Sequence, residues 1–221
     1  AEVFWPGPLT MIVKKSDLVP RETTGGLDTV AIRMPDHATA LEFIRAAGGY
    51  IAAPSANTSG RPSPTLASHV KDDLDGRIEM IIDGGEVGIG VESTIVDLSE
   101  GTPTILRPGY VTREMLERVL GDVDVDRTIL SGNSTQAPKA PGMKYRHYAP
   151  HGEMTIVEGD SEEVVRVINE NVAAAKASGR KTAVLCTDET KPFIKADVIK
   201  SAGSRADEHE IARHLYRILR E

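Results

Sequence analysis

The chain is organised around one loop, residues 52–64, which reads Ala52-Ala53-Pro54-Ser55-Ala56-Asn57-Thr58-Ser59-Gly60-Arg61-Pro62-Ser63-Pro64. A short apolar run precedes the loop, which then combines three serines, a threonine, an asparagine and an arginine with three prolines and a glycine. Proline stiffens the backbone and glycine permits close approach, while short hydroxyl and amide side chains lose little entropy when they become ordered. This composition suits a polar ligand such as a nucleotide, although an ordinary surface turn uses the same residue types.

Length and composition indicate a soluble globular protein. The 221 residues allow one large domain or two modest ones, and with 4% aromatic residues the core must be built from aliphatic side chains. The single cysteine, Cys186, excludes an internal disulfide and argues against a cysteine-based zinc site. No apolar run approaches the ~20 residues that span a bilayer, and no signal segment opens the chain. We therefore expect a cytoplasmic protein that does not enter a membrane.

The formal net charge of -7 argues against strong nucleic-acid binding by the whole chain, because phosphate binding depends on clustered lysine and arginine. One local basic stretch exists, at residues 139–147, with three lysine or arginine residues, a histidine and no acidic residue.

Alternating strand and helix patterns indicate an α/β fold. In chain order they predict the end of a helix at 1–5, strands at 9–13 and 29–33, a helix from 36 to 47, a strand at 50–53, a helix at 66–74, strands at 80–82, 91–97 and 104–107, and a helix at 113–120. Thr112 can cap that last helix and Gly121 closes it. The glycine-rich loop at 83–90 lacks the spacing of a dinucleotide fingerprint and leads into a strand.

A second alternation follows Pro150. It predicts strands at 154–157, 181–186 and 196–199, a helix at 160–177 with a capping box formed by Asp160 and Glu163, and a helix at 207–220. This order implies a parallel sheet. Cys186 is expected in the core. His209 and His214 are five residues apart on their helix and do not share a face as metal ligands would, so we expect no metal site.

The composition between these parts is typical of a linker, which divides the chain into a first domain at 1–130, a linker at 131–150 and a second domain at 151–221. Residues 141–150 are nevertheless rich in aromatic and cationic side chains. We expect this stretch to fold over the first domain, with Tyr145 near a bound nucleotide. Both domains are expected to be incomplete.

Two arginines end predicted strands. Arg33 lies two residues before Pro35, and Arg107 lies directly before Pro108. The loop at 52–64 follows another predicted strand. A guanidinium binds carboxylate or phosphate with two hydrogen bonds, and ligands of open α/β sheets bind at the carboxyl ends of strands. Each arginine alone reads as a surface residue, but together they suggest one anion-binding crevice.

Six ordered motifs give the chain a family resemblance. It resembles the threonylcarbamoyl-AMP synthases, in the two-domain form of the YrdC family, through residues 4–10, 33–37, 54–60, 93–97, 107–109 and 141–150. The resemblance implies a YrdC-like twisted open mixed sheet with helices, followed by a smaller Rossmann-like parallel α/β unit.

The resemblance also implies the reaction and its ligands. The activity would be ATP-dependent condensation of L-threonine with bicarbonate, giving threonylcarbamoyl-AMP for the N6-threonylcarbamoyladenosine modification of tRNA. Mg²⁺ would accompany ATP, and proteins of a tRNA-modification complex are possible partners. The family pattern assigns Thr29, Ser55, Asn57, Ser63 and Arg107 to ATP, and Arg33, Ala53 and Ser93 to threonine. It assigns no catalytic side chain.

The resemblance departs from the family pattern at one point. The family has an amino-terminal segment with a Lys-x-Arg motif and further threonine and histidine ligands, and no such segment precedes Ala1 in this sequence. The spacing of Lys144-Tyr145-Arg146 is the same, but this stretch belongs to the linker motif. We therefore expect the 221 residues alone to be impaired in catalysis. Two other functions stay open, a related domain that forms a different carbamoyl adenylate and an RNA-binding module.

Overall fold

The computed structural model describes residues 1–126 and 152–221, and the chain forms two compact units. The first unit comprises residues 1–55 with those from 92 to 126, and the second comprises residues 56–91 with 152–221. The predicted domain boundaries at 130 and 150, the linker and Tyr145 lie outside the described residues.

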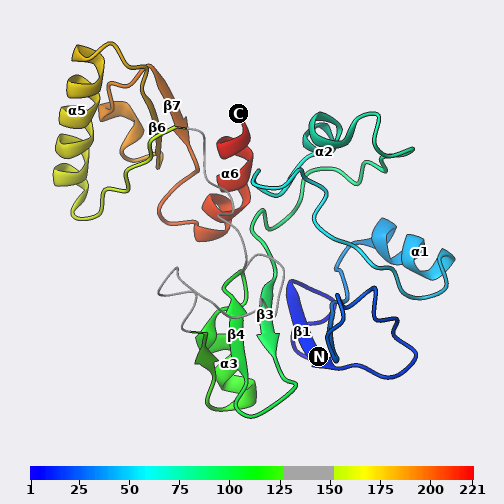
Figure 1. Ribbon diagram of the computed structural model, residues 1–221. Coiled ribbons are helices and arrows are strands. Elements are labelled where there is room, and N and C mark those ends of the chain that lie inside the picture. The colour runs from blue at the N-terminus through cyan, green and yellow to red at the C-terminus, as the bar shows by residue number, and fades with distance from the viewer. Residues whose placement is uncertain (127–151) are drawn as a thin grey trace. The chain divides into compact units, whose positions relative to one another are not determined.

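The first unit is built on an open, mixed five-stranded sheet (Figure 1). Its strands are β1 (Leu9–Lys14), β2 (Thr29–Ile32), β3 (Thr94–Asp97), β4 (Thr104–Arg107) and β5 (Asp124–Val125), in the order β2-β1-β3-β4-β5. β1 pairs antiparallel with β2 and parallel with β3, while β4 is antiparallel to β3 and parallel to β5. The predicted open mixed sheet is confirmed.

The core of this unit lies mainly on one face of the sheet. Val96 on β3 is fully buried, as is Leu116 on the helix α3 (Arg113–Leu120). Because successive strand residues point to opposite faces, Ile95 belongs to a second, smaller cluster on the other face with Ile12 and Leu106. α3 begins where the Thr112 hydroxyl accepts a hydrogen bond from the Met115 amide, as the capping pattern predicts.

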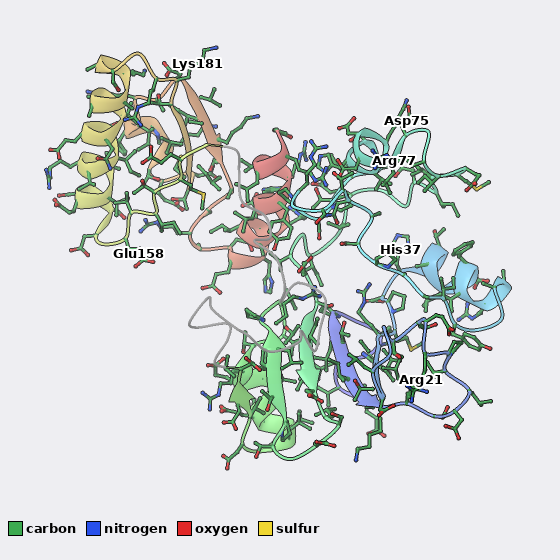
Figure 2. All side chains as sticks on the ribbon, viewed as in Figure 1. Arg21, His37, Asp75, Arg77, Glu158 and Lys181 are labelled. Atoms are coloured by element: carbon green, nitrogen blue, oxygen red, sulfur yellow. The ribbon has the colours of Figure 1, made fainter. Side chains whose placement is uncertain are left out.

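Helix α1 (Ala38–Ala46) follows β2 and has no buried residue. His37, labelled in Figure 2, occupies its N-cap and accepts a hydrogen bond from the Ala40 amide. The glycine pair at 48–49 ends the helix with both residues at positive φ.

The second unit contains a two-stranded parallel sheet of β6 (Ala183–Cys186) and β7 (Val198–Ser201), confirming the predicted parallel arrangement. Its helices are α2 (Ala67–Leu74), α5 (Ser161–Ala177), the 3₁₀ turn η1 (Lys191–Phe193) and α6 (Glu208–Arg220). Asn169 of α5 donates to the Phe193 carbonyl and accepts from the Lys195 amide, which joins α5 to the segment between the strands. Within the described residues, no helix is long and apolar enough to cross a membrane.

Several predicted elements are wrong. Residues 50–53, 80–82 and 154–157 form no strand, because an apolar run becomes a strand only where another strand supplies hydrogen bonds. Tyr50, Met80 and Ile156 are correspondingly well exposed. The first residues form turns in place of a helix end. The predicted capping box does not form either, since the Asp160 side chain makes no capping hydrogen bond and the Glu163 carboxylate pairs with Arg166. Cys186 is only half-buried.

The first prediction concerns the fully buried Thr94, whose hydroxyl donates to the Val111 carbonyl at 2.6 Å. Thr94→Val keeps the shape but leaves that carbonyl without its partner, so unfolding should become easier by about 1–3 kcal/mol. Thr104→Val, which removes a hydroxyl from an exposed local bond to Thr102, is the matched control. Equal midpoints for both variants in urea unfolding would contradict the structural role of Thr94.

Candidate functional site

The first unit brings three predicted site residues together. Arg33 follows β2, Ser93 precedes β3 and Arg107 ends β4. These strand ends meet because β1 lies between β2 and β3, and β4 runs beside β3. The predicted meeting of Arg33 and Arg107 at one edge of the sheet therefore has a structural basis, and Ser93, which the resemblance assigns to threonine, lies at the same edge.

Arg107 is held by the turn that leads into β3. Its Nε and Nη2 donate to the Ser93 carbonyl at 3.1 and 2.8 Å, and Nη2 also donates to Ser93 Oγ at 3.0 Å. Its Nη1 lies 2.9 Å from the Glu92 carboxylate, with both side chains largely buried. Ser93 Oγ is also within 2.8 Å of Thr10 Oγ1 on β1. The guanidinium thus has a fixed orientation.

Arg33 lies in the field of this fixed charge. The pKa of the Arg33 guanidinium is lowered, first by partial desolvation and then by the positive charge of Arg107. Arg33 still exposes part of its surface to solvent. Two guanidinium groups beside one carboxylate, Glu92, leave an excess of positive charge, so this edge of the sheet is suited to an anion.

A close turn presses this edge together. A Cβ atom added to Gly109 would lie 2.4 Å from the Glu92 carbonyl oxygen and 2.6 Å from the Thr94 nitrogen. Only glycine therefore allows the Arg107-Pro108-Gly109 turn to pack against the turn at Glu92 and Ser93.

The other predicted site residues are distributed differently. Thr29 lies at the far end of β2, paired with Lys14, and Ala53 and Ser55 are exposed residues of the first unit. Asn57 and Ser63 belong to the second unit, where both are half-buried. Convergence of the whole ATP set on one crevice therefore stays a prediction.

Within the second unit, Asn57 shapes the loop. Its side-chain amide donates to the carbonyls of Thr58 and Arg61 at 2.9 and 3.1 Å. The Thr58 amide in turn donates to the carboxylate of Asp73 on α2 at 3.1 Å. Burial alone would raise the pKa of Asp73, but hydrogen bonds from Arg220 and Thr58 outweigh it and lower the pKa.

Sequence reasoning missed three residues of these clusters. Thr10 is the last residue of one quoted motif and Glu92 adjoins another, but their partners are distant in sequence and only the sheet order brings them together. Asp73 is one of two adjacent aspartates on α2, and no pattern in the sequence distinguishes the buried one. In the part of the chain that the structure describes, no group of three or more acidic, histidine or cysteine side chains could hold a metal ion.

Comparison with known proteins places the chain in a family. The family model described as "Telomere recombination" matches residues 1–109, and that of the C-terminal domain of threonylcarbamoyl-AMP synthase matches residues 111–221. The chain belongs to the threonylcarbamoyl-AMP synthase family, in its two-domain form. The resemblance expected from the motifs is confirmed.

Individual relatives agree with this assignment. The whole of this chain aligns with 63% of the threonylcarbamoyl-AMP synthase of Pyrococcus abyssi, at 49% identity. It also aligns with 61% of the threonylcarbamoyl-AMP synthase of Bacillus subtilis, again at 49% identity. A crystal structure of P. abyssi Sua5 complexed with L-threonine superposes with a TM-score of 0.91 over 99% of this chain and 62% of that one. The chain thus spans about three fifths of the length of these relatives.

The second prediction tests the close packing of the family's Arg-Pro-Gly motif. Gly109→Ala should destabilise the protein by about 1–3 kcal/mol, because backbone atoms at 92–94 cannot move aside as a flexible side chain would. Gly88→Ala is the control, since a Cβ there meets no heavy atom within 4 Å. Chemical denaturation with unchanged stability in the Gly109 variant would show that the two turns are not in close contact.

Proposed function

We propose that the protein containing this chain is an L-threonylcarbamoyladenylate synthase. It would condense L-threonine, bicarbonate and ATP into threonylcarbamoyl-AMP, pyrophosphate and water. The observation that carries the proposal is the cluster of Arg33, Ser93 and Arg107 at one edge of the sheet. It occurs in a chain that is 49% identical to two proteins named threonylcarbamoyl-AMP synthase.

Threonine would be held by the first unit. The Arg33 guanidinium has the charge and fork geometry to pair with the carboxylate, and the Ser93 hydroxyl is a neighbouring polar group. Ala53, an exposed residue, completes the expected set. A relative's structure is described as complexed with L-threonine, which supports this ligand class.

ATP would be bound by the residues predicted from the family pattern, Thr29, Ser55, Ser63 and Arg107, with Tyr145 over the nucleotide and Asn57 maintaining the loop. Arg107 already donates to Ser93, so its contribution to phosphate is mainly its fixed positive charge. Mg²⁺ would enter with ATP, bound largely by phosphate oxygens and water.

The reaction needs no protein nucleophile. The threonine amine attacks the bicarbonate carbon and water leaves, forming a carbamate whose oxygen then attacks the α-phosphorus. The bond from that phosphorus to the β-phosphate oxygen breaks, and pyrophosphate leaves. The protein's task is therefore to position the carbamate in line with the α-phosphate and to stabilise the developing negative charge.

The product would donate its threonylcarbamoyl group to N6 of adenosine in tRNA, with help from proteins of a tRNA-modification complex. The net charge of -7 favours delivery through such partners over strong tRNA binding by this chain.

Pyrophosphate release by the full-length protein tests the proposal. Release should require L-threonine, bicarbonate and ATP together, and mass spectrometry should detect threonylcarbamoyl-AMP. Release that continues without threonine would indicate a different carbamoyl adenylate and would reject the proposed substrate. Salt-dependent tRNA retention without any pyrophosphate release would favour the RNA-binding alternative.

The third prediction separates the two substrates. Arg33→Lys keeps the charge but loses the paired geometry, so threonine binding should weaken by roughly tenfold while ATP binding stays within about twofold. Calorimetry with each ligand measures both, and Arg45→Lys on α1, an exposed arginine paired with Glu42, is the control. Equal losses for threonine and ATP would make Arg33 a structural residue.

A further inference from the structure

The buried carboxylate of Asp73 contacts the loop at residues 58–62. The Asp73 side chain has no exposed surface, and its Oδ2 accepts from the Thr58 amide at 3.1 Å and from Arg220 Nη2 at 2.8 Å. Its Oδ1 also pairs with Arg61. A buried charge is tolerated only when it is paired and hydrogen-bonded, so these contacts form one interdependent set.

Arg220 is the buried cation of this set. Its side chain is 3% exposed, and it lies near the end of α6, in the part of the chain that matches the C-terminal domain of the family. Its Nε donates to the Pro62 carbonyl at 2.9 Å, and its Nη2 donates to the same oxygen. One guanidinium therefore holds both the Asp73 carboxylate and the backbone of the loop.

The helix that carries Arg220 is docked at two further points in the same unit. A Cβ added to Gly90 would lie 2.3 Å from the Arg213 backbone, so α6 packs directly against this glycine. Arg217 pairs with Glu86 at 3.1 Å, but both side chains are partly exposed. In Figure 1 the end of α6 (red) lies beside the cyan segment that leads into α2. Among these three contacts, the one through Arg220 reaches the loop at residues 58–62.

We propose that Arg220 is a positioning residue for the loop at residues 52–64, to which the proposed function assigns ATP binding. Through Arg220, the C-terminal domain would set the conformation of residues 58–62 of this loop. It does so by two contacts, one to the Pro62 carbonyl and one to Asp73, which in turn holds the Thr58 amide. This inference rests on the proposed function, in which the loop binds ATP. ATP affinity therefore depends on a side chain that need not touch ATP.

The test uses the full-length protein and three variants. Arg220→Met removes the cation and leaves Asp73 buried without its main partner. The double variant Arg220→Met with Asp73→Asn removes both charges, so the stability lost to an unpaired buried charge should return while Pro62 still lacks its donors. Arg217→Met is the matched control, an arginine on the same helix whose ion pairs with Glu86 and Glu221 are partly exposed.

Three measurements are made on each protein: the thermal midpoint, hydrogen exchange of the Thr58 and Arg61 amides, and the KM values for ATP and threonine. In Arg220→Met the midpoint should fall, the loop amides should exchange at least about tenfold faster, and the KM for ATP should rise about tenfold. The KM for threonine should stay within about twofold. The double variant should recover the midpoint but keep the fast exchange and the raised KM for ATP. Arg217→Met should resemble the parent in all three.

Two outcomes decide between the claims. If the double variant recovers the KM for ATP together with its midpoint, Arg220 acts only on stability and the proposal is overturned. If the parent protein does not bind ATP, the proposed function fails by itself. Loop exchange then decides the positioning role alone, which is overturned if Arg220→Met and Arg217→Met exchange alike.

Discussion

The paired donation from Arg107 to the Ser93 carbonyl is the constraint on which the first unit depends. β3 and β4 pair antiparallel, with Ile95 opposite Arg107, and the guanidinium reaches across this pair to the residue that precedes β3. Hydrogen bonds from a charged donor contribute about 1.5–3 kcal/mol each. The backbone at Ser93, just before β3, is therefore held more firmly than hydrogen bonds between neutral groups would hold it. The Gly109 turn packs against the backbone of the same segment, residues 92–94, so the edge of the sheet and the candidate site share one scaffold.

Under the proposed function, Arg107 would both organise this turn and supply positive charge to ATP, so its removal should disturb the turn as well as the ligand. A substitution at Arg33 is the better test of ligand binding, because Arg33 is more exposed than Arg107. The pKa of Arg33 is lowered by desolvation and by the charge of Arg107. Asp73 plays a comparable structural role in the second unit, where a buried carboxylate fixes a loop backbone.

The sequence was most informative where short-range chemistry decides the structure. β1, β2 and β4 follow from β-branched and apolar runs, and α3 follows from its Thr112 cap and the glycine after it. Strands expected at 50–53 and 80–82 failed because pairing depends on which other strand is adjacent, and the two-residue β5 was too short to predict. At the site, arginines at strand ends identified Arg33 and Arg107, whereas the Glu92 pair and the link from Asp73 to Arg220 depend on the folded chain.

The central claim is that the edge formed by Arg33, Ser93 and Arg107 receives the threonine carboxylate. A crystal structure of the full-length protein with L-threonine tests it most directly. We predict that both carboxylate oxygens lie about 3 Å from the Arg33 guanidinium, with the ligand beside Ser93. Threonine bound elsewhere, with Arg33 directed into solvent, would contradict the account.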